Sequence, residues 1–154
     1  MDELWNAWSA GFFDGEGCVR IFSGNNRQTQ NGKLYVYKRY TVRLIVGQKD
    51  RTPLDRLVLH YGGSITYIKK TETYHWQING ANAITCLRKW LPYLTVKLAQ
   101  VNIALEYWEA RDILLDEEKD TYVEAMAKLK TIYKTPGNRY LNGVPTTTMR
   151  DTAT

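Results

Sequence analysis

The chain has 154 residues, 44% of them hydrophobic and 24% charged, which suits one domain with a substantial core. No apolar run approaches the roughly 18 residues that span a bilayer, and the acidic start Met1-Asp2-Glu3 differs from a secretory signal or transit peptide. We therefore expect no membrane residence and no secretion. Cys18 and Cys86 are too few for a disulfide framework and favour reduced core residues in an intracellular, reducing compartment.

The net charge of +5 is distributed unevenly along the chain. Residues 1–16 contain four acids and no base, whereas residues 17–100 contain fourteen Lys and Arg against three acids, and residues 101–154 contain seven bases and nine acids. This pattern predicts a face that binds a polyanion beside an acidic site. Ordinary surface solvation explains it poorly, because residues 17–49 hold seven bases and no acid.

Hydrophobic spacing predicts a first helix over residues 4–13, with Leu4, Trp8, Gly11 and Phe12 on one face. Gly11 and Gly15 share one side of this helix, and each glycine costs about 1 kcal/mol of helix propensity. The pair therefore predicts the close approach of another backbone, either from a second molecule or inside one subunit.

A strand over residues 19–22 is expected next, then a polar loop in which Ser23-Gly24-Asn25-Asn26 and Asn31-Gly32 form turns. Residues 34–48 alternate as a longer strand. One face of that strand carries Tyr37, Arg39, Thr41, Arg43 and Ile45, and the other carries Tyr40, Val42, Leu44 and Val46. The arginine-bearing face is a candidate ligand surface.

Thr52 as N-cap and Pro53 in the first turn predict a helix that ends at Gly62-Gly63. A second hairpin follows over residues 64–70 and 73–79, with Tyr74, Trp76 and Ile78 inward. We expect further helices over residues 80–91, 96–115 and 116–133. The fold class is therefore α+β, in which helices cover one face of antiparallel strands and leave the basic face open. Residues 1–134 form the domain, and residues 135–154 are expected to be an extended or disordered tail.

Residues 8–17 carry the most specific signal, Trp-Ser-Ala-Gly-Phe-Phe-Asp-Gly-Glu-Gly. The segment delivers two carboxylates, Asp14 and Glu16, to the C-terminal end of a helix, where the helix dipole is unfavourable for negative charge. A divalent cation at Glu16 would relieve that conflict.

These residues resemble the LAGLIDADG motif of homing endonucleases, with residues 9–17 in its core. The helix and hairpin order, Gly62-Gly63-Ser64-Ile65, and Leu91-Pro92-Tyr93-Leu94 followed by Lys97 and Gln100 extend the resemblance over residues 4–115. It implies an αββαββα core with added C-terminal helices and an antiparallel sheet that forms a DNA-binding saddle. The single copy of the motif implies a homodimer, with Trp8, Gly11, Phe12 and Gly15 at its interface.

The resemblance further implies a site-specific DNA endonuclease, borne by an intron, that cuts both strands of a long pseudo-palindromic target and leaves staggered 3′ overhangs. Glu16, helped by the carbonyl of Gly15, would bind Mg²⁺, with Mn²⁺ or another divalent cation possible. Gln48 would position the attacking water, and Lys97 would offset charge on the phosphate. Considered as residues alone, Gln48 could instead cap the next helix and Lys97 could be ordinary surface. Asp14 is expected to cap or orient the helix ends.

Both hairpins would place outward side chains in the major groove. The candidate DNA-binding residues on the hairpins are Arg20, Tyr37, Arg39, Thr41, Arg43, Ile45, Tyr67, Lys69, Thr73, His75 and Gln77. In the first loop Arg27, Gln28, Gln30 and Lys33 would contact the outer part of the target or the phosphates. The alternative function is a non-cleaving relative, either an RNA maturase that binds its own intron RNA or a DNA-binding protein. Glu16 favours cleavage, because DNA-binding regulators on this fold need no acid at that position, and it is compatible with a bifunctional endonuclease and maturase.

Overall fold

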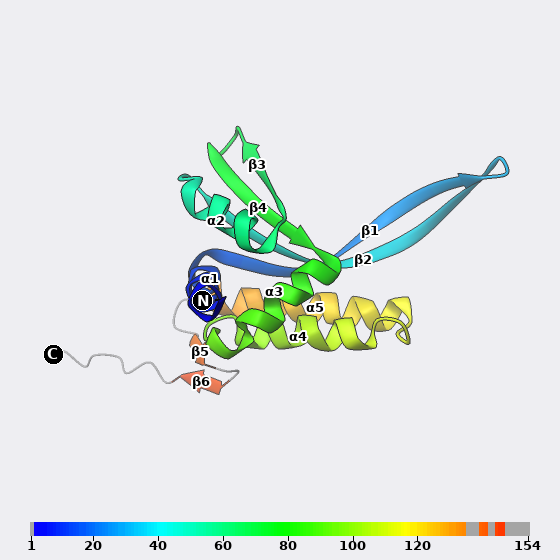
Figure 1. Cartoon of the computed structure of the whole chain (residues 1–154). Coiled ribbons are helices and arrows are strands. Elements are labelled where there is room, and N and C mark those ends of the chain that lie inside the picture. Colours follow the sequence, from blue (N-terminus) through cyan, green and yellow to red (C-terminus); the bar gives the residue numbers. More distant parts are fainter. Residues whose placement is uncertain (1, 135–138, 142–143, 147–154) are drawn as a thin grey trace.

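Two hairpins form a curved, four-stranded antiparallel sheet in the strand order β1-β2-β4-β3. The first hairpin pairs β1 (Gly17–Gln30) with β2 (Lys33–Gln48), and the second pairs β3 (Ser64–Ile68) with β4 (Thr73–Asn79). The centre of the sheet is the pairing of β2 with β4. This computed structural model describes residues 2–134, 139–141 and 144–146 (Figure 1).

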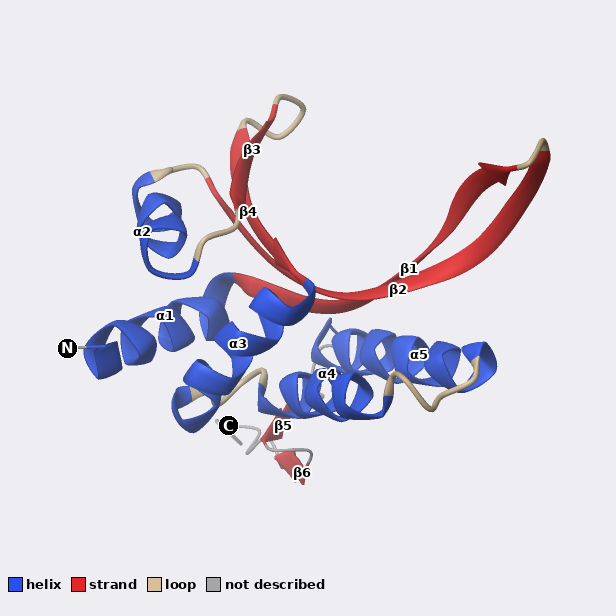
Figure 2. Ribbon diagram, turned by 45° about the vertical axis from the view of Figure 1, so that its right-hand side comes forward, coloured by secondary structure: helices blue, strands red, loops and turns tan. Residues whose placement is uncertain are grey.

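The helices lie on the convex side of this sheet. Below it lie α1 (Asp2–Glu16), α3 (Gly80–Trp90), α4 (Leu98–Ala110) and α5 (Asp116–Lys134), with a 3-10 turn at Leu91–Tyr93. The remaining helix, α2 (Thr52–Tyr61), packs on β3 and β4. Within the described ranges no helix covers the concave side (Figure 2). The predicted α+β architecture is therefore confirmed.

The core confirms the predicted alternation in β2 and β4. Val42, Leu44 and Val46 are fully buried, and so is Trp76 of β4. Facing them are buried side chains of α1 and α3, among them Phe13, whose ring centroid lies 5.2 Å from that of Trp90. One face of the sheet is thus fixed against the helices, which orients the other face outward.

The first hairpin is longer than predicted. The polar loop expected after residue 22 is instead strand: Gly24 pairs with Arg39 and Asn25 with Lys38, and the chain turns only at Asn31-Gly32. Both turn residues have positive φ, 51° and 73°, as a two-residue hairpin turn requires. The outer part of the hairpin extends beyond the helices (Figure 2). Its polar residues therefore lack the hydrophobic alternation that marks a half-buried strand.

Other boundaries also differ from the prediction: α1 is longer than the expected 4–13, and β3 ends at Ile68 and not at residue 70. The N-cap of α2 is Arg51 and not Thr52, because the carbonyl of Arg51 accepts the first helical bonds and the Asp50 carboxylate accepts the Thr52 N–H at 2.9 Å. The helix α4 is shorter than the predicted 96–115, since Lys97 is its N-cap and the chain turns after Ala110 towards α5. Within the predicted tail, β5 (Arg139–Leu141) pairs with β6 (Val144–Thr146); its other residues lie outside the described ones. Among the described helices, none has the length and apolar character of a membrane span.

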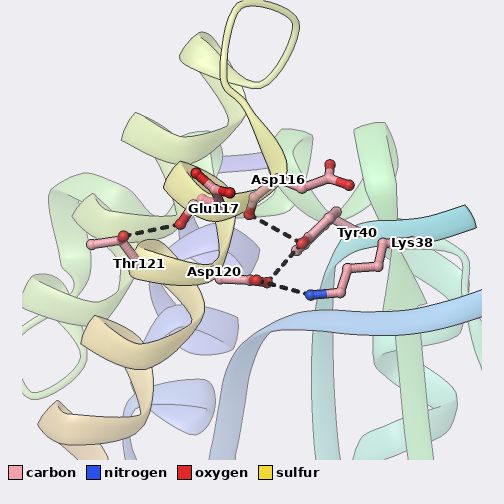
Figure 3. A network of polar contacts seen from close by, with 6 residues as sticks. All are labelled: Lys38, Tyr40, Asp116, Glu117, Asp120 and Thr121. Atoms are coloured by element: carbon pink, nitrogen blue, oxygen red, sulfur yellow. Dashed lines mark hydrogen bonds and ion pairs between the residues drawn. The ribbon is translucent and has the colours of Figure 1, made fainter.

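A polar network ties the first hairpin to α5 (Figure 3). The Asp120 carboxylate accepts hydrogen bonds from the Tyr40 hydroxyl at 2.6 Å and from the Lys38 ammonium at 2.9 Å. The Tyr40 hydroxyl also lies 3.2 Å from the carbonyl oxygen of Asp116, at the start of α5. These contacts hold β2 on its helix-facing side, where the hairpin begins to leave the body of the protein.

Candidate catalytic centre and nucleic-acid interface

The junction between α1 and β1 presents Gly15 and Glu16 to solvent. Helix α1 ends at Glu16 and β1 begins at Gly17 without an intervening loop. Gly17 permits this junction, because a Cβ there would lie 2.1 Å from Cδ2 of the buried Phe13. The carboxylate of Glu16 accepts no hydrogen bond from any other described side chain, so it remains available to a ligand outside the chain.

Hydrogen bonds of Asp14 and Lys97 connect the end of α1 to the start of α4. The Asp14 carboxylate accepts the backbone N–H of Thr95 at 2.6 Å and that of Lys97 at 2.9 Å. The Lys97 ammonium in turn donates to the carbonyl oxygen of Asp14 at 2.5 Å. The expected orienting role of Asp14 is therefore what the structure shows. Lys97 also supplies positive charge at the negative end of the α1 dipole.

Lys97 is half-buried, unlike an ordinary surface lysine. Its Nζ lies 5.9 Å from the ring centroid of Phe13. Burial lowers the pKa of the Lys97 ammonium below its ordinary value, while the charges of Asp14, Cys18 and Glu16 act in the opposite direction. Lys97 and Glu16 thus lie close enough to interact electrostatically, as residues of one site.

Gln48 ends β2 beside the same junction. Gly17 pairs with Val46, so the strand end that carries Gln48 lies next to the end of α1. Gln48 is half-buried and does not cap α2, a position that Arg51 occupies. Arg51, one of the neighbouring cations, is engaged by Asp55 at 2.9 Å and lies over the ring of Tyr74 at 5.8 Å.

Two residues of this region, Cys18 and Lys130, could not be identified as site residues from the sequence. The Lys130 ammonium of α5 lies 3.0 Å from the sulfur of Cys18, two residues beyond Glu16. The charges of both groups also act on Lys97. The positive charge of Lys130 is the only available sequence signal, since the contact joins residues 112 positions apart.

The concave face of the sheet gathers most of the predicted DNA-binding residues. Arg20 pairs with Arg43 and Ile45 with Gln77, and both pairs lie opposite to the buried face. By the same alternation, this face also carries Gln28, Gln30, Lys33, Tyr37, Arg39, Thr41, Thr73 and His75. The basic row therefore runs from the centre of the sheet to the tip of the first hairpin.

Three predicted residues lie elsewhere. Arg27 pairs with Val36, which places it on the opposite face of the hairpin from Arg39. Tyr67 pairs with Tyr74, and the two rings lie 5.1 Å apart on the helix-facing side. Lys69 lies in the turn after β3, beyond the paired strand. The register instead adds Ser64, Thr66 and Asn79 to the concave face, residues that a sequence without a known register could not assign.

The predicted interface residues of α1 form an exposed strip. Gly11 and Gly15 are exposed, and a Cβ added at either would meet no described atom within 4 Å. Trp8 is 38% exposed and stacks on Phe12 at 5.3 Å between ring centroids. The possibility that these glycines serve close packing inside one subunit is therefore wrong for the part of the chain that the structure describes.

The chain resembles known endonucleases in sequence and in structure. A sequence model of the family described as LAGLIDADG endonuclease matches residues 9–114. No curated protein matches the chain. Among solved structures, homing endonuclease I-CvuI in complex with the I-CreI target aligns with a TM-score of 0.67 and 23% identity, over 90% of this chain and 87% of that one.

Two further structures share the fold. The archaeal intron-encoded homing endonuclease I-Vdi141I, complexed with DNA, aligns with a TM-score of 0.62 and 19% identity over 85% of each chain. The LAGLIDADG meganuclease I-AabMI, bound to uncleaved DNA, aligns with a TM-score of 0.53 and 19% identity. That alignment covers 81% of this chain but 43% of the longer I-AabMI chain.

Proposed function

The chain belongs to the LAGLIDADG endonuclease family, and from this premise we propose that it is a homodimeric, site-specific DNA endonuclease. Each subunit hydrolyses one phosphodiester of a long pseudo-palindromic target, and the staggered cuts leave 3′ overhangs. One observation carries the proposal. The exposed carboxylate of Glu16 interacts electrostatically with the half-buried ammonium of Lys97, at the end of α1 where the basic, concave sheet begins.

The residues at the end of α1 fit a hard divalent cation. Glu16 is an exposed carboxylate, and the carbonyl of Gly15 has no helical donor because residue 19 already belongs to β1. These oxygens are the ligand type that Mg²⁺ and Mn²⁺ prefer. Such an ion, when bound, activates water and stabilises the leaving 3′ oxygen. I-CvuI, which is similar in fold, was solved with DNA in the presence of Mg and of Ca.

The remaining residues of the site bind and orient. Lys97 is anchored on the Asp14 carbonyl, so its positive charge lies at a fixed place, where it offsets the phosphate charge without reorganisation. Gln48 lies beside the junction and orients the attacking water through its amide. The arginines and polar residues of the concave face hold the duplex and read base edges.

The exposed strip on α1 supports the homodimer. Gly11 and Gly15 leave room for a second backbone, and aromatic side chains flank them. The alignment with I-AabMI points the same way, because that chain has room for two units of this size. A two-fold axis through α1 makes each half of the target equivalent, which is why the target is nearly palindromic. I-Vdi141I is intron-encoded, and we propose the same setting for this chain.

The test measures cutting and binding separately. The chain is incubated with a library of randomised duplexes and Mg²⁺, and the selected target is then used with Glu16→Gln. Wild type should cut it, and Glu16→Gln should bind it without cutting, because the amide is a poor ligand for Mg²⁺. Glu3→Gln, an exposed acid at the opposite end of α1, should cut normally. Cleavage by Glu16→Gln would disprove this assignment, whereas a wild type that binds without cutting would support the maturase or DNA-binding alternative.

A further inference from the structure

The guanidinium of Arg43 is held on two sides at the centre of the concave face. Its Nε donates to the Oδ1 atom of Asn79 at 2.9 Å. Its Cζ lies 4.6 Å from the ring centroid of Phe22, within the range of a cation–π contact. The three residues come from three adjacent strands, β2, β4 and β1, so the arrangement depends on the sheet register.

Asn79 is diverted from a role that its position would favour. It is the N-cap residue of α3, where an asparagine side chain normally accepts a backbone N–H of the first turn. Here its side chain makes no cap hydrogen bond, and Oδ1 is directed to Arg43 instead. The hydrogen bond from Arg43 is therefore the polar interaction that explains the orientation of the Asn79 side chain.

A glycine makes room for the ring on the other side. Gly24 follows Phe22 on the same face of β1, and a Cβ there would lie 3.0 Å from Cε1 of Phe22. These residues border a hollow of about 280 Å³, which Arg39 also lines. The hollow opens on the concave face between Arg43, which is held by its two contacts, and Arg39, which is exposed.

The contact with Asn79 decides which donors of Arg43 remain for a ligand. An arginine has five N–H donors in a planar fork, and two of them can bind O6 and N7 of guanine together. Because Nε is engaged by Asn79, the terminal pair of Nη atoms is the edge left for a base. A guanidinium already fixed in one pose loses less freedom when it binds.

We propose that Asn79 and Phe22 position Arg43 to read guanine at one base pair in each half-site. The inference rests on the proposed function, since it assumes that the concave face binds DNA. Arg43 is the reading residue, and Asn79 and Phe22 act through it. Arg39 makes no comparable contact among the described residues, so it reads its own position with less selectivity.

The test is a binding profile over randomised duplexes, in a Glu16→Gln background so that cleavage is not needed. Arg43→Ala should lose the guanine preference at one position per half-site, by about fivefold to 150-fold. Asn79→Leu, similar in size but without an acceptor, should weaken the preference at that same position. Phe22→Leu should do so less. Asn82→Leu, an exposed residue of α3, is the control and should bind like the parent.

A conservative variant separates positioning from structure. Asn79→Asp keeps the acceptor for Nε, so it should retain the guanine preference, while its negative charge lowers affinity for all sequences alike. An unchanged profile in Asn79→Leu would overturn the proposal, as would loss at a position different from that lost in Arg43→Ala. Binding of duplexes without any sequence preference would overturn the proposed function as well.

Discussion

Lys97 and Asp14 position each other, and this reciprocity links the end of α1 to the start of α4. Asp14 accepts the backbone N–H of Lys97, and the side chain of Lys97 returns to the backbone of Asp14. A lysine anchored in this way is confined to the end of α1 that carries Glu16. Burial disfavours the charged form of lysine, so an ordinary surface lysine would gain nothing from the half-buried position of Lys97.

Replacement of Lys97 should therefore reduce cleavage far more than binding. Lys97→Met keeps the length of the side chain and removes its charge, so we expect the single-turnover cleavage rate to fall about 100-fold or more, as when one donor to a transition state is lost. Affinity for the target should change little, because one cation among many is removed. Lys89→Met, an exposed lysine of α3, is the matched control. Equal cleavage by the two variants would contradict the assignment.

The residues of the proposed catalytic centre could be predicted from the sequence better than those of the proposed DNA-binding face. Glu16 and Lys97 follow from a motif and its neighbourhood, and in the structure Lys97 is anchored on Asp14, two residues before Glu16. Tyr67 lies on the helix-facing side and not outward, because side-chain direction in a strand depends on register, and a shift of one residue reverses it. Arg27, expected in a loop, lies in a paired strand. The Lys130 contact with Cys18 depends on how α5 packs along β1, which no local pattern encodes.

At the scale of the element, α1 has one face that packs in the core and one exposed face that carries two glycines. Ala10 and Phe13 are fully buried in the core, whereas Gly11 and Gly15 face away from every described atom. Glycine weakens a helix by about 1 kcal/mol relative to alanine, so two exposed glycines are a cost to the isolated subunit. The proposed contact with a second α1 would explain this cost.

Gly11→Leu should therefore separate folding from association. In one subunit the new side chain meets no described atom, so helix content by circular dichroism should be retained or rise. At a two-fold interface two copies would clash, and overpacking costs about 1–3 kcal/mol each, so the dimer should weaken about 30-fold or more. Sedimentation velocity measures this change, with Ala81→Leu on the exposed side of α3 as control. Association equal to wild type would exclude this face as the interface.

The elements themselves could largely be predicted, with the outer part of the first hairpin as the exception. Strands that contact the core, such as β2 and β4, show buried residues at every second position. The outer half of β1 extends beyond the helices (Figure 2) and consists of polar residues and glycine, so its sequence is typical of a loop. Its pairing with β2 gives it strand structure, and that pairing is not visible in β1 alone.

Across the whole molecule, the uneven charge becomes a division between two sides. The bases of residues 17–49 lie mainly on the first hairpin and its concave face, and the acids of α5 lie on the helical side. Asp120 is an exception with a structural use, because it reaches the hairpin through Lys38 and Tyr40 (Figure 3). The hairpin that is proposed to reach the outer target is therefore fixed to the body by a carboxylate.

The orientation of the hairpin should consequently depend on the protonation of Asp120. Hydrogen bonds from Tyr40 and Lys38 hold the pKa of the Asp120 carboxyl below its ordinary value, and the same partnership raises the pKa of Lys38. A lowered pKa in the folded state means that the stabilisation is complete above the ordinary pKa of aspartate, about 3.9. It is lost as the pH falls through the lower, folded value.

Asp120→Ala should expose this dependence without affecting the catalytic centre. At neutral pH we expect faster hydrogen exchange in β2 around Tyr40 than in wild type and weaker binding of duplexes that extend to the outer target. A target limited to the central base pairs should be bound equally.

Because these groups are exposed to solvent, the melting temperature should change little. The difference in exchange should disappear once the pH falls below the lowered pKa of Asp120, where the wild-type carboxylate is also protonated. Glu124→Ala, an exposed acid one turn further along α5, should behave like wild type at every pH. If Asp120→Ala and Glu124→Ala gave the same exchange at neutral pH, the network would have no part in holding the hairpin, and its direction would be set by the packing of β1 and β2 on the helices alone.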